Sequence, residues 1–192
     1  MPLSRSRRRL LIAAGLSCLP ASLRFAGEAF AALPTLPAAG NADPATARAL
    51  AFAHTHTGET LRVTFAHGDV YVPSALAQLG HLLRDFRNGA EHPIDPALFD
   101  QLHALAAVTG AKAPFQVISG YRSPATNALL RKATGGVASQ SLHLAGQAID
   151  IRLPDVPLAD LRDAALSLKA GGVGYYAASD FVHVDTGRVR RW

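Results

Sequence analysis

The 192-residue chain contains a single cysteine, Cys18. One cysteine excludes an internal disulfide and a structural zinc site built from several thiolates. Any bound metal must therefore be held by histidine and carboxylate side chains. Charged residues are also few, at 17%, whereas 49% of the residues are hydrophobic, which excludes a globally disordered chain and is enough for an ordinary core.

The body of the chain also lacks a strongly basic face. Five arginines and one glutamate in residues 1–31 account for +4 of the formal net charge of +5, so the remainder carries about +1. Its one basic cluster is Arg188, Arg190 and Arg191, which we expect on the surface. Nucleic-acid binding needs a face that neutralises several phosphates. We therefore predict no nucleic-acid partner.

Residues 1–31 have the pattern of an export signal. The segment 6–11 (SRRRLL) has the form of a twin-arginine motif, an apolar run follows over 10–19, and 29–31 (AFA) offers a small-x-small cleavage site. The apolar run is too short to span a bilayer comfortably, and no later segment is suited to do so. The pattern predicts export by the twin-arginine (Tat) translocase to the periplasm, with no stable membrane span in the mature form.

The rest of the sequence predicts one domain of the α+β class. Residues 32–49 are rich in Pro, Ala and Gly and predict a flexible lead-in, and residues 50–192 form the domain. Hydrophobic periodicity predicts helices at 75–86, with Ser74 as N-cap, and at 97–108, 125–132 and 158–168. It predicts strands at 51–53, 61–65, 70–72, 115–118, 148–153, 174–176 and 181–185. Strands concentrated late in the chain favour a small antiparallel sheet with helices packed on it.

Two of the eight histidines stand beside carboxylates in a pattern typical of a metal site. In residues 141–150 (SLHLAGQAID), small residues allow the backbone to fold closely, so that His143 and Asp150 converge. In residues 181–185 (FVHVD), strand alternation places His183 and Asp185 on one face. Two imidazoles and one carboxylate form a three-ligand zinc set that leaves the fourth position open to water. The alternative is a buried hydrogen-bond network without metal. The other six histidines lie in turns, in loops or on polar helix faces, and we expect them to be solvated: His54, His56, His67, His81, His92 and His103.

These residues resemble the peptidase M15-like zinc D-Ala-D-Ala carboxypeptidase and murein endopeptidase family. The family signature, Ser-x-His-x-x-Gly-x-Ala-x-Asp with a later strand histidine, is matched here by Ser141, His143, Gly146, Ala148, Asp150 and His183. The stretches 119–123 (SGYRS) and 171–187 (GGVGYYAASDFVHVDTG) also match, and they are most similar to the murein endopeptidase K-like (DUF882) branch, whose members carry twin-arginine signals. The resemblance spans residues 50–192.

The resemblance implies a hedgehog/D-Ala-D-Ala peptidase-like fold with the zinc site on the sheet. It implies that His143, Asp150 and His183 bind one zinc ion per chain. It further implies that Arg122 lies near the metal, where a guanidinium stabilises the oxyanion formed during hydrolysis. Ser119, Tyr121 and Ser141 are expected to line the substrate cleft.

Two carboxylates compete for the role of general base. Asp180 lies three residues before the last histidine, where many relatives place Glu or Asp. Strand parity puts it on the face opposite His183 unless the strand begins after Asp180 or contains a bulge. Asp185 shares the face of His183. Whichever is not the base is expected to support a ligand histidine or to be solvated.

The function implied is a zinc metallo-endopeptidase that hydrolyses peptide cross-links between peptidoglycan stem peptides. Two alternatives stay open at this point. One is a carboxypeptidase of the wall that releases a terminal D-amino acid. The other is a wall-binding module that has kept the fold and lost catalysis.

Overall fold

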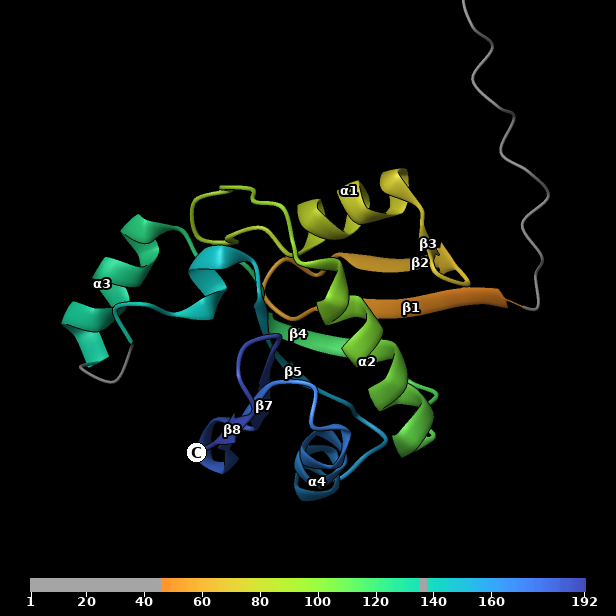
Figure 1. The fold of residues 1–192 in the computed structure, drawn as a ribbon. Helices are drawn as coiled ribbons and strands as arrows, with labels where there is room; N and C mark the ends of the chain where they lie inside the picture. Colours follow the sequence, from red (N-terminus) through yellow and green to blue (C-terminus); the bar gives the residue numbers. More distant parts are fainter. Residues whose placement is uncertain (1–45, 135–137) are drawn as a thin grey trace, which may run out of the picture. The chain divides into compact units, whose positions relative to one another are not determined.

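The computed structural model describes residues 46–134 and 138–192, which form an eight-stranded sheet with helices packed on it (Figure 1). The strands are β1 (Ala47–His54), β2 (Thr60–His67), β3 (Val70–Tyr71), β4 (Phe115–Ser119), β5 (Ala148–Arg152), β6 (Gly172–Tyr176), β7 (Phe181–Asp185) and β8 (Arg190–Arg191). The α-helices are α1 (Pro73–Leu82), α2 (Pro96–Thr109), α3 (Pro124–Thr134) and α4 (Leu158–Leu168), with 3-10 turns η2 (Leu142–Ala145) and η3 (Ala177–Ser179). The predicted α+β class is confirmed.

The sheet has the strand order β3-β2-β1-β4-β5-β7-β6-β8 and is mixed. The pairs β1–β4 and β6–β8 are parallel, and the other neighbours are antiparallel. The sheet is thus larger than the small antiparallel sheet that we expected. The parallel pair in its centre arises because the chain crosses from β1 to β4 through α1 and α2 rather than through a tight hairpin.

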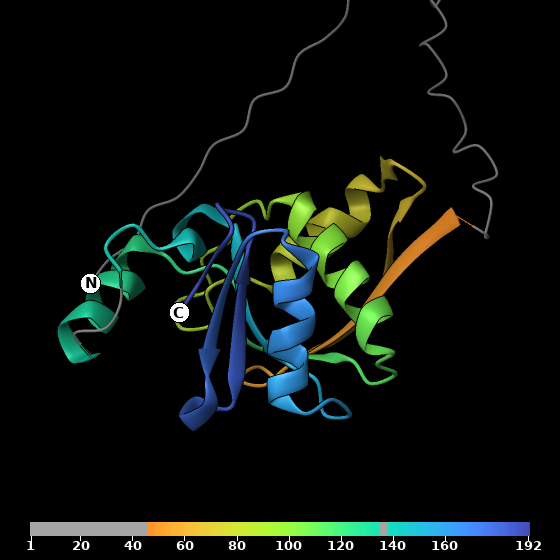
Figure 2. The same cartoon turned by 60° about the horizontal axis from the view of Figure 1, so that its bottom comes forward.

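The side chains of β5 and β7 point alternately into the hydrophobic core and to the opposite face of the sheet. Ile149, Ile151, Val182 and Val184 are fully buried in the core, on which α2 and α4 also pack (Figure 2). Each such side chain contributes about 1.5–3 kcal/mol through burial. The residues between them, Asp150 among them, therefore project from the other face.

The predicted helix over 75–86 differs from the observed α1 at both ends. The helix begins at Pro73 with Val72 as N-cap, so Ser74 is its second residue and not its cap. It ends at Leu82, since residues 83–95 leave the helix axis and form an irregular segment. By contrast α2 extends only one residue beyond the predicted helix at each end, and its N-cap Asp95 accepts a hydrogen bond from the backbone N–H of Ala97.

The beginning of the chain is described only from residue 46. The expected export signal at residues 1–31 lies outside the described residues, as do residues 32–45 of the expected lead-in. Strand β1 begins at Ala47, three residues inside the stretch expected to be flexible. Across residues 46–134 and 138–192, no helix is both long and apolar enough to cross a bilayer.

Candidate metal centre

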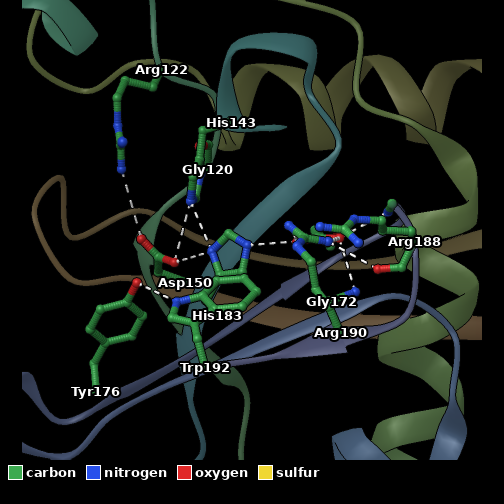
Figure 3. A network of polar contacts seen from close by, with 12 residues as sticks. Gly120, Arg122, His143, Asp150, Gly172, Tyr176, His183, Arg188, Arg190 and Trp192 are labelled. Carbon is green, nitrogen blue, oxygen red and sulfur yellow. Dashed lines mark hydrogen bonds and ion pairs between the residues drawn. The ribbon is translucent and has the colours of Figure 1, made fainter. Parts of the chain in front are cut away.

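Three buried side chains converge on the polar face of the sheet (Figure 3). His143 comes from η2, Asp150 from β5 and His183 from β7. Asp150 Oδ1 lies 2.9 Å from His183 Nδ1 and 3.3 Å from His143 Nε2, and the two nitrogens are 3.2 Å apart. The structure thus brings together the three ligands predicted from the sequence.

Backbone pairing and one glycine explain this convergence. Asp150 and His183 are direct cross-strand partners, so their side chains leave the sheet at the same point. His143 lies on the turn before β5, which ends at Gly146 in a left-handed conformation with φ 66°. A Cβ atom at Gly146 would lie 2.2 Å from the carbonyl oxygen of Pro93. Only glycine fits this turn, which explains its place between His143 and Asp150 in the motif.

Each histidine has its outer nitrogen fixed by a hydrogen bond. His143 Nδ1 lies 2.7 Å from the carbonyl oxygen of Gly120, to which it must donate. His183 Nε2 lies 3.0 Å from Asp185 Oδ2 and donates to that carboxylate. In neutral imidazoles the inner nitrogens, His143 Nε2 and His183 Nδ1, are therefore unprotonated and directed at Asp150.

Three lone-pair donors this close repel one another unless a cation lies between them. Burial opposes ionisation of Asp150, but the charge and hydrogen bonds of His143 and His183 hold its pKa below the usual range. Burial likewise opposes protonation of His183, yet Asp150 and Asp185 raise its pKa. In a tetrahedral zinc site with bonds of about 2.0–2.1 Å, ligand atoms lie about 3.3 Å apart. The observed separations fit a metal ion better than a proton shared among three groups.

Asp185 is fully buried and both of its oxygens are engaged. Besides His183, it accepts hydrogen bonds from the backbone N–H groups of Gly172 and Gly187 and from both terminal nitrogens of Arg190, at 2.6–3.0 Å. Burial alone would raise its pKa, but these hydrogen bonds, that of His183 first, lower it well below the usual range. Asp185 is therefore an anchored anion that fixes the tautomer and orientation of the His183 ring.

Replacing Asp185 with asparagine is expected to weaken metal binding by about 10- to 100-fold, because asparagine is uncharged and has only one acceptor oxygen, so the charged acceptor that orients the His183 ring is lost. Isothermal titration of the metal-stripped protein with zinc measures the affinity. Asp180→Asn serves as the matched control, since it removes a carboxylate from the same region and is expected to leave the affinity unchanged. Equal affinities for wild type and Asp185→Asn would contradict the orienting role.

Arg122 places a cationic group beside Asp150. Its Nη2 lies 4.0 Å from Asp150 Oδ2, and its backbone N–H donates to the carbonyl oxygen of His143 at 3.1 Å. Burial lowers the pKa of Arg122, while Asp150 and Tyr176 act on it electrostatically in the opposite direction. Its buried Nε has no hydrogen-bond partner among the described residues. The guanidinium therefore lies beside the candidate ligands with an N–H donor that is not used within the described residues.

The residues predicted to line the substrate cleft lie at the end of β4, in the loop after it and just before η2. Ser119 is the cross-strand partner of Asp150, and a register shift in β4 after Val117 places it there. Tyr121 stacks on His92 at 4.9 Å, and Ser141 is the half-buried N-cap of η2. All three lie in the chain segments next to Arg122 or His143.

Asp180 does not contact the three ligands. It lies just before β7, in a left-handed conformation with φ 54°, and its Oδ2 forms an ion pair with Arg152 at 2.6 Å. Its side chain is 64% exposed. Strand β7 begins at Phe181, after Asp180. Strand parity therefore does not apply to Asp180, and its side chain is not confined to the face opposite His183.

Two features of the centre have no counterpart in the sequence prediction. Arg190, expected on the surface, forms an ion pair with the buried Asp185. The loops that hold the ligands are also anchored by carboxylates of segment 83–95: Asp85 accepts from the backbone N–H of Ser123 at 2.9 Å, and Asp95 accepts from Thr186 Oγ1 at 2.8 Å. Hydrophobic periodicity gives no signal for the hydrogen-bond partner of an acidic residue, so it does not predict these supports.

Of the six histidines expected to be solvated, two are exposed, three are half-buried (His67, His92 and His103) and one is buried. His56 and His81 are exposed, whereas His54 is buried at the end of β1 and accepts a hydrogen bond from the backbone N–H of His56. Its expected solvation is therefore wrong, because its ring packs against the ring of Phe86, in the segment after α1, at 5.6 Å. In the described part of the chain, no further group of His, Cys, Asp or Glu has the geometry of a metal site.

Comparison with known proteins identifies the family of the chain. The family described as peptidoglycan L,D-endopeptidase MepK matches residues 42–192. Peptidoglycan L,D-endopeptidase MepK of Escherichia coli (strain K12) is 43% identical over 187 residues, which cover 97% of both chains. Probable peptidoglycan L,D-endopeptidase MepK of Haemophilus influenzae is 44% identical over 146 residues, which cover 76% of this chain and 78% of that protein. The chain therefore belongs to the MepK family of peptidases, as the resemblance of its metal-site motif to the murein endopeptidase K-like branch indicated.

Proposed function

We propose that this protein is a zinc-dependent endopeptidase that hydrolyses peptide cross-links of peptidoglycan. The observation that carries the proposal is the convergence of His143 Nε2, His183 Nδ1 and Asp150 Oδ1, with both outer imidazole nitrogens tied to acceptors. The names of the relatives, peptidoglycan L,D-endopeptidases, support the substrate class.

The donor set fits one zinc ion per chain better than the common alternatives. Two nitrogens and one oxygen suit zinc, whereas magnesium and calcium prefer sites made entirely of oxygen. Three protein ligands leave a fourth position for water or substrate, as catalytic zinc sites require. When bound there, zinc would polarise the scissile carbonyl and make water acidic enough to attack near neutral pH.

The chain's own residues supply charge and proton transfer around this centre. Arg122, 4.0 Å from Asp150, is positioned to stabilise the negative charge that develops on the carbonyl oxygen. Asp180 is assigned the proton-accepting role: it takes a proton from the attacking water and returns it to the leaving amine. We prefer it to Asp185 because Asp185 is fully buried and both of its oxygens already accept hydrogen bonds. Asp180 is exposed, and among the described residues Arg152 is its one ion-pair partner. Ser119, Tyr121 and Ser141 are assigned to the substrate cleft.

Replacing Asp180 with asparagine is expected to lower kcat by about 10²-fold, because proton transfer by a positioned carboxylate is lost. Metal affinity should not change, which separates this variant from Asp185→Asn. The measurement is steady-state cleavage of a purified cross-linked muropeptide. Asp163→Asn is the matched control, since Asp163 is also exposed (62%) and paired with an arginine but lies on α4. Wild-type kcat in Asp180→Asn would exclude Asp180 as the base.

Residues 1–31 are proposed to direct the protein through the Tat translocase to the periplasm, where its substrate lies. The support is the twin-arginine pattern in the sequence together with relatives named for peptidoglycan. A protein exported in the folded state could receive its metal before it crosses the membrane.

The decisive test of function is digestion of purified cross-linked muropeptides by the full chain, followed by mass spectrometry. Conversion of dimers to monomers that stops with chelator and returns with zinc is the expected result, and the product masses identify the bond. Loss of a single terminal residue would instead indicate a carboxypeptidase. Binding to the wall without any cleavage, at full zinc occupancy, would indicate a binding module.

A further inference from the structure

Tyr176, at the end of β6, lies on the face of the sheet that carries the metal ligands. Gly174 is the cross-strand partner of His183, and Tyr176 is the partner of Phe181, two residues along each strand. Side chains two residues apart on a strand share a face. The ring of Tyr176 stacks on Phe181 at 4.6 Å, which fixes its plane. In Figure 3 its hydroxyl is directed toward Asp150 and the ring of Trp192.

Trp192 holds this hydroxyl in place. The indole Nε1 donates to Tyr176 Oη at 2.7 Å, and the indole ring lies 5.2 Å from the ring of His183. Backbone hydrogen bonds fix Trp192 against β6, from its own N–H to the oxygen of Val173 and from the N–H of Tyr175 to its oxygen. Gly174 leaves the necessary room, since a Cβ atom there would lie 2.7 Å from the indole.

This arrangement leaves the phenolic proton available. An indole N–H only donates, so the Tyr176 oxygen is the acceptor in the pair, and its own O–H needs a different partner. Among the described residues, the bond from Trp192 is the one hydrogen bond of this side chain. Tyr176 is 39% exposed and Trp192 49%, although both lie beside a buried centre. A donor aimed at the site and accessible from outside is suited to contact a bound molecule.

We propose that Tyr176 is a second hydrogen-bond donor, besides Arg122, to the oxygen of the scissile carbonyl as that oxygen becomes negatively charged, and that Trp192 is the residue that positions it. The proposal rests on the proposed function. The proposal needs no reactant beyond water and the peptide substrate. The water oxygen bonds to the carbonyl carbon and the carbon–nitrogen bond breaks, while the phenolic proton stays on Tyr176 throughout. A donor that acts mainly on the developing charge changes kcat more than KM.

The test compares the wild type with four variants on a purified cross-linked muropeptide, with zinc content and thermal stability measured on the same samples. Tyr176→Phe is expected to lower kcat by about 10²-fold with KM nearly unchanged and full zinc occupancy. The matched control is Tyr175→Phe, because Tyr175 lies next in sequence on the opposite face, under Arg162, and should behave as wild type. Trp192→Phe keeps a ring but removes the donor, and we expect a fall in kcat of about five-fold.

The double variant Tyr176→Phe with Trp192→Phe distinguishes positioning from mere packing. If Trp192 acts through Tyr176, the double variant should be no slower than Tyr176→Phe alone, since the two effects are then not additive. Full additivity would overturn the positioning role. A Tyr176→Phe variant that raises KM and keeps kcat would overturn the transition-state role. If the wild type is active and Tyr176→Phe is equally active, this inference alone is overturned. If the zinc-loaded wild type cleaves no muropeptide, the proposed function is overturned and this inference with it.

Discussion

Replacing His143 with alanine is expected to remove metal binding and to lower peptidoglycan cleavage by at least about 10³-fold. The His143 ring offers one of the three candidate ligand atoms, and its outer nitrogen is held by the Gly120 carbonyl. Across residues 46–134 and 138–192, no other His, Cys, Asp or Glu joins this group and could replace it. A metal contributes several kcal/mol to the stabilisation of transition-state charge, which corresponds to a factor of this size. Metal analysis of the dialysed protein and muropeptide digestion measure both effects.

The control for this variant is His81→Ala. The His81 side chain is 58% exposed and pairs with Glu91 on the surface, so its loss should change neither metal content nor cleavage. The fold of His143→Ala should persist, because the core on the opposite face of the sheet does not include this residue. A folded His143→Ala protein that retained stoichiometric zinc would show that the metal is bound elsewhere.

Replacing Gly146 with alanine is expected to destabilise the protein by about 3–5 kcal/mol, at the upper end of the range for single substitutions. Two costs combine here. Alanine is strained at φ 66°, and its Cβ would lie 2.2 Å from the backbone oxygen of Pro93, which cannot rotate away as a side chain would. Relief of this clash would move η2 and with it His143. Urea unfolding of the metal-free protein measures the loss without a contribution from metal binding.

Gly110→Ala separates the two costs. Gly110 has nearly the same backbone angle, φ 67°, but among the described residues, apart from its chain neighbours, no atom lies within 4 Å of the position of its Cβ. This variant should lose only about 1–2 kcal/mol, the cost of the left-handed conformation. If both variants lost the same stability, the contact with Pro93 would carry no weight, and the glycine in the family signature would need another explanation.

The parts of the site that depend on local pattern could be predicted from the sequence. The spacing from His143 to Asp150 contains the turn that brings them together, and strand alternation places His183 and Asp185 on one face, where they form a hydrogen bond of 3.0 Å. The same alternation predicts a core made of the intervening residues. The last two predictions succeed because they use only the two-residue period of a strand.

The parts that depend on long-range pairing could not be predicted. Strand β8 has two residues, too few for any period, yet its pairing with β6 brings Arg190 to Asp185 and Trp192 to Tyr176. Periodicity also cannot show where α1 ends, because the apolar residue Leu83 is fully buried although it lies beyond the last helical turn. Tertiary contacts decide these features, and single-sequence patterns carry no information about them.

The alternation in β5 and β7 ties the pairing register to the chemistry of the protein. A shift of one residue between these strands would direct His183 into the apolar interior and present Val182 and Val184 to solvent. Such a molecule would bury an unpaired imidazole and lose its ligand set in the same step. Partly active misfolded forms are therefore not accessible by slippage of this strand pair: a chain that has not reached its correct pairing is also unable to hydrolyse anything.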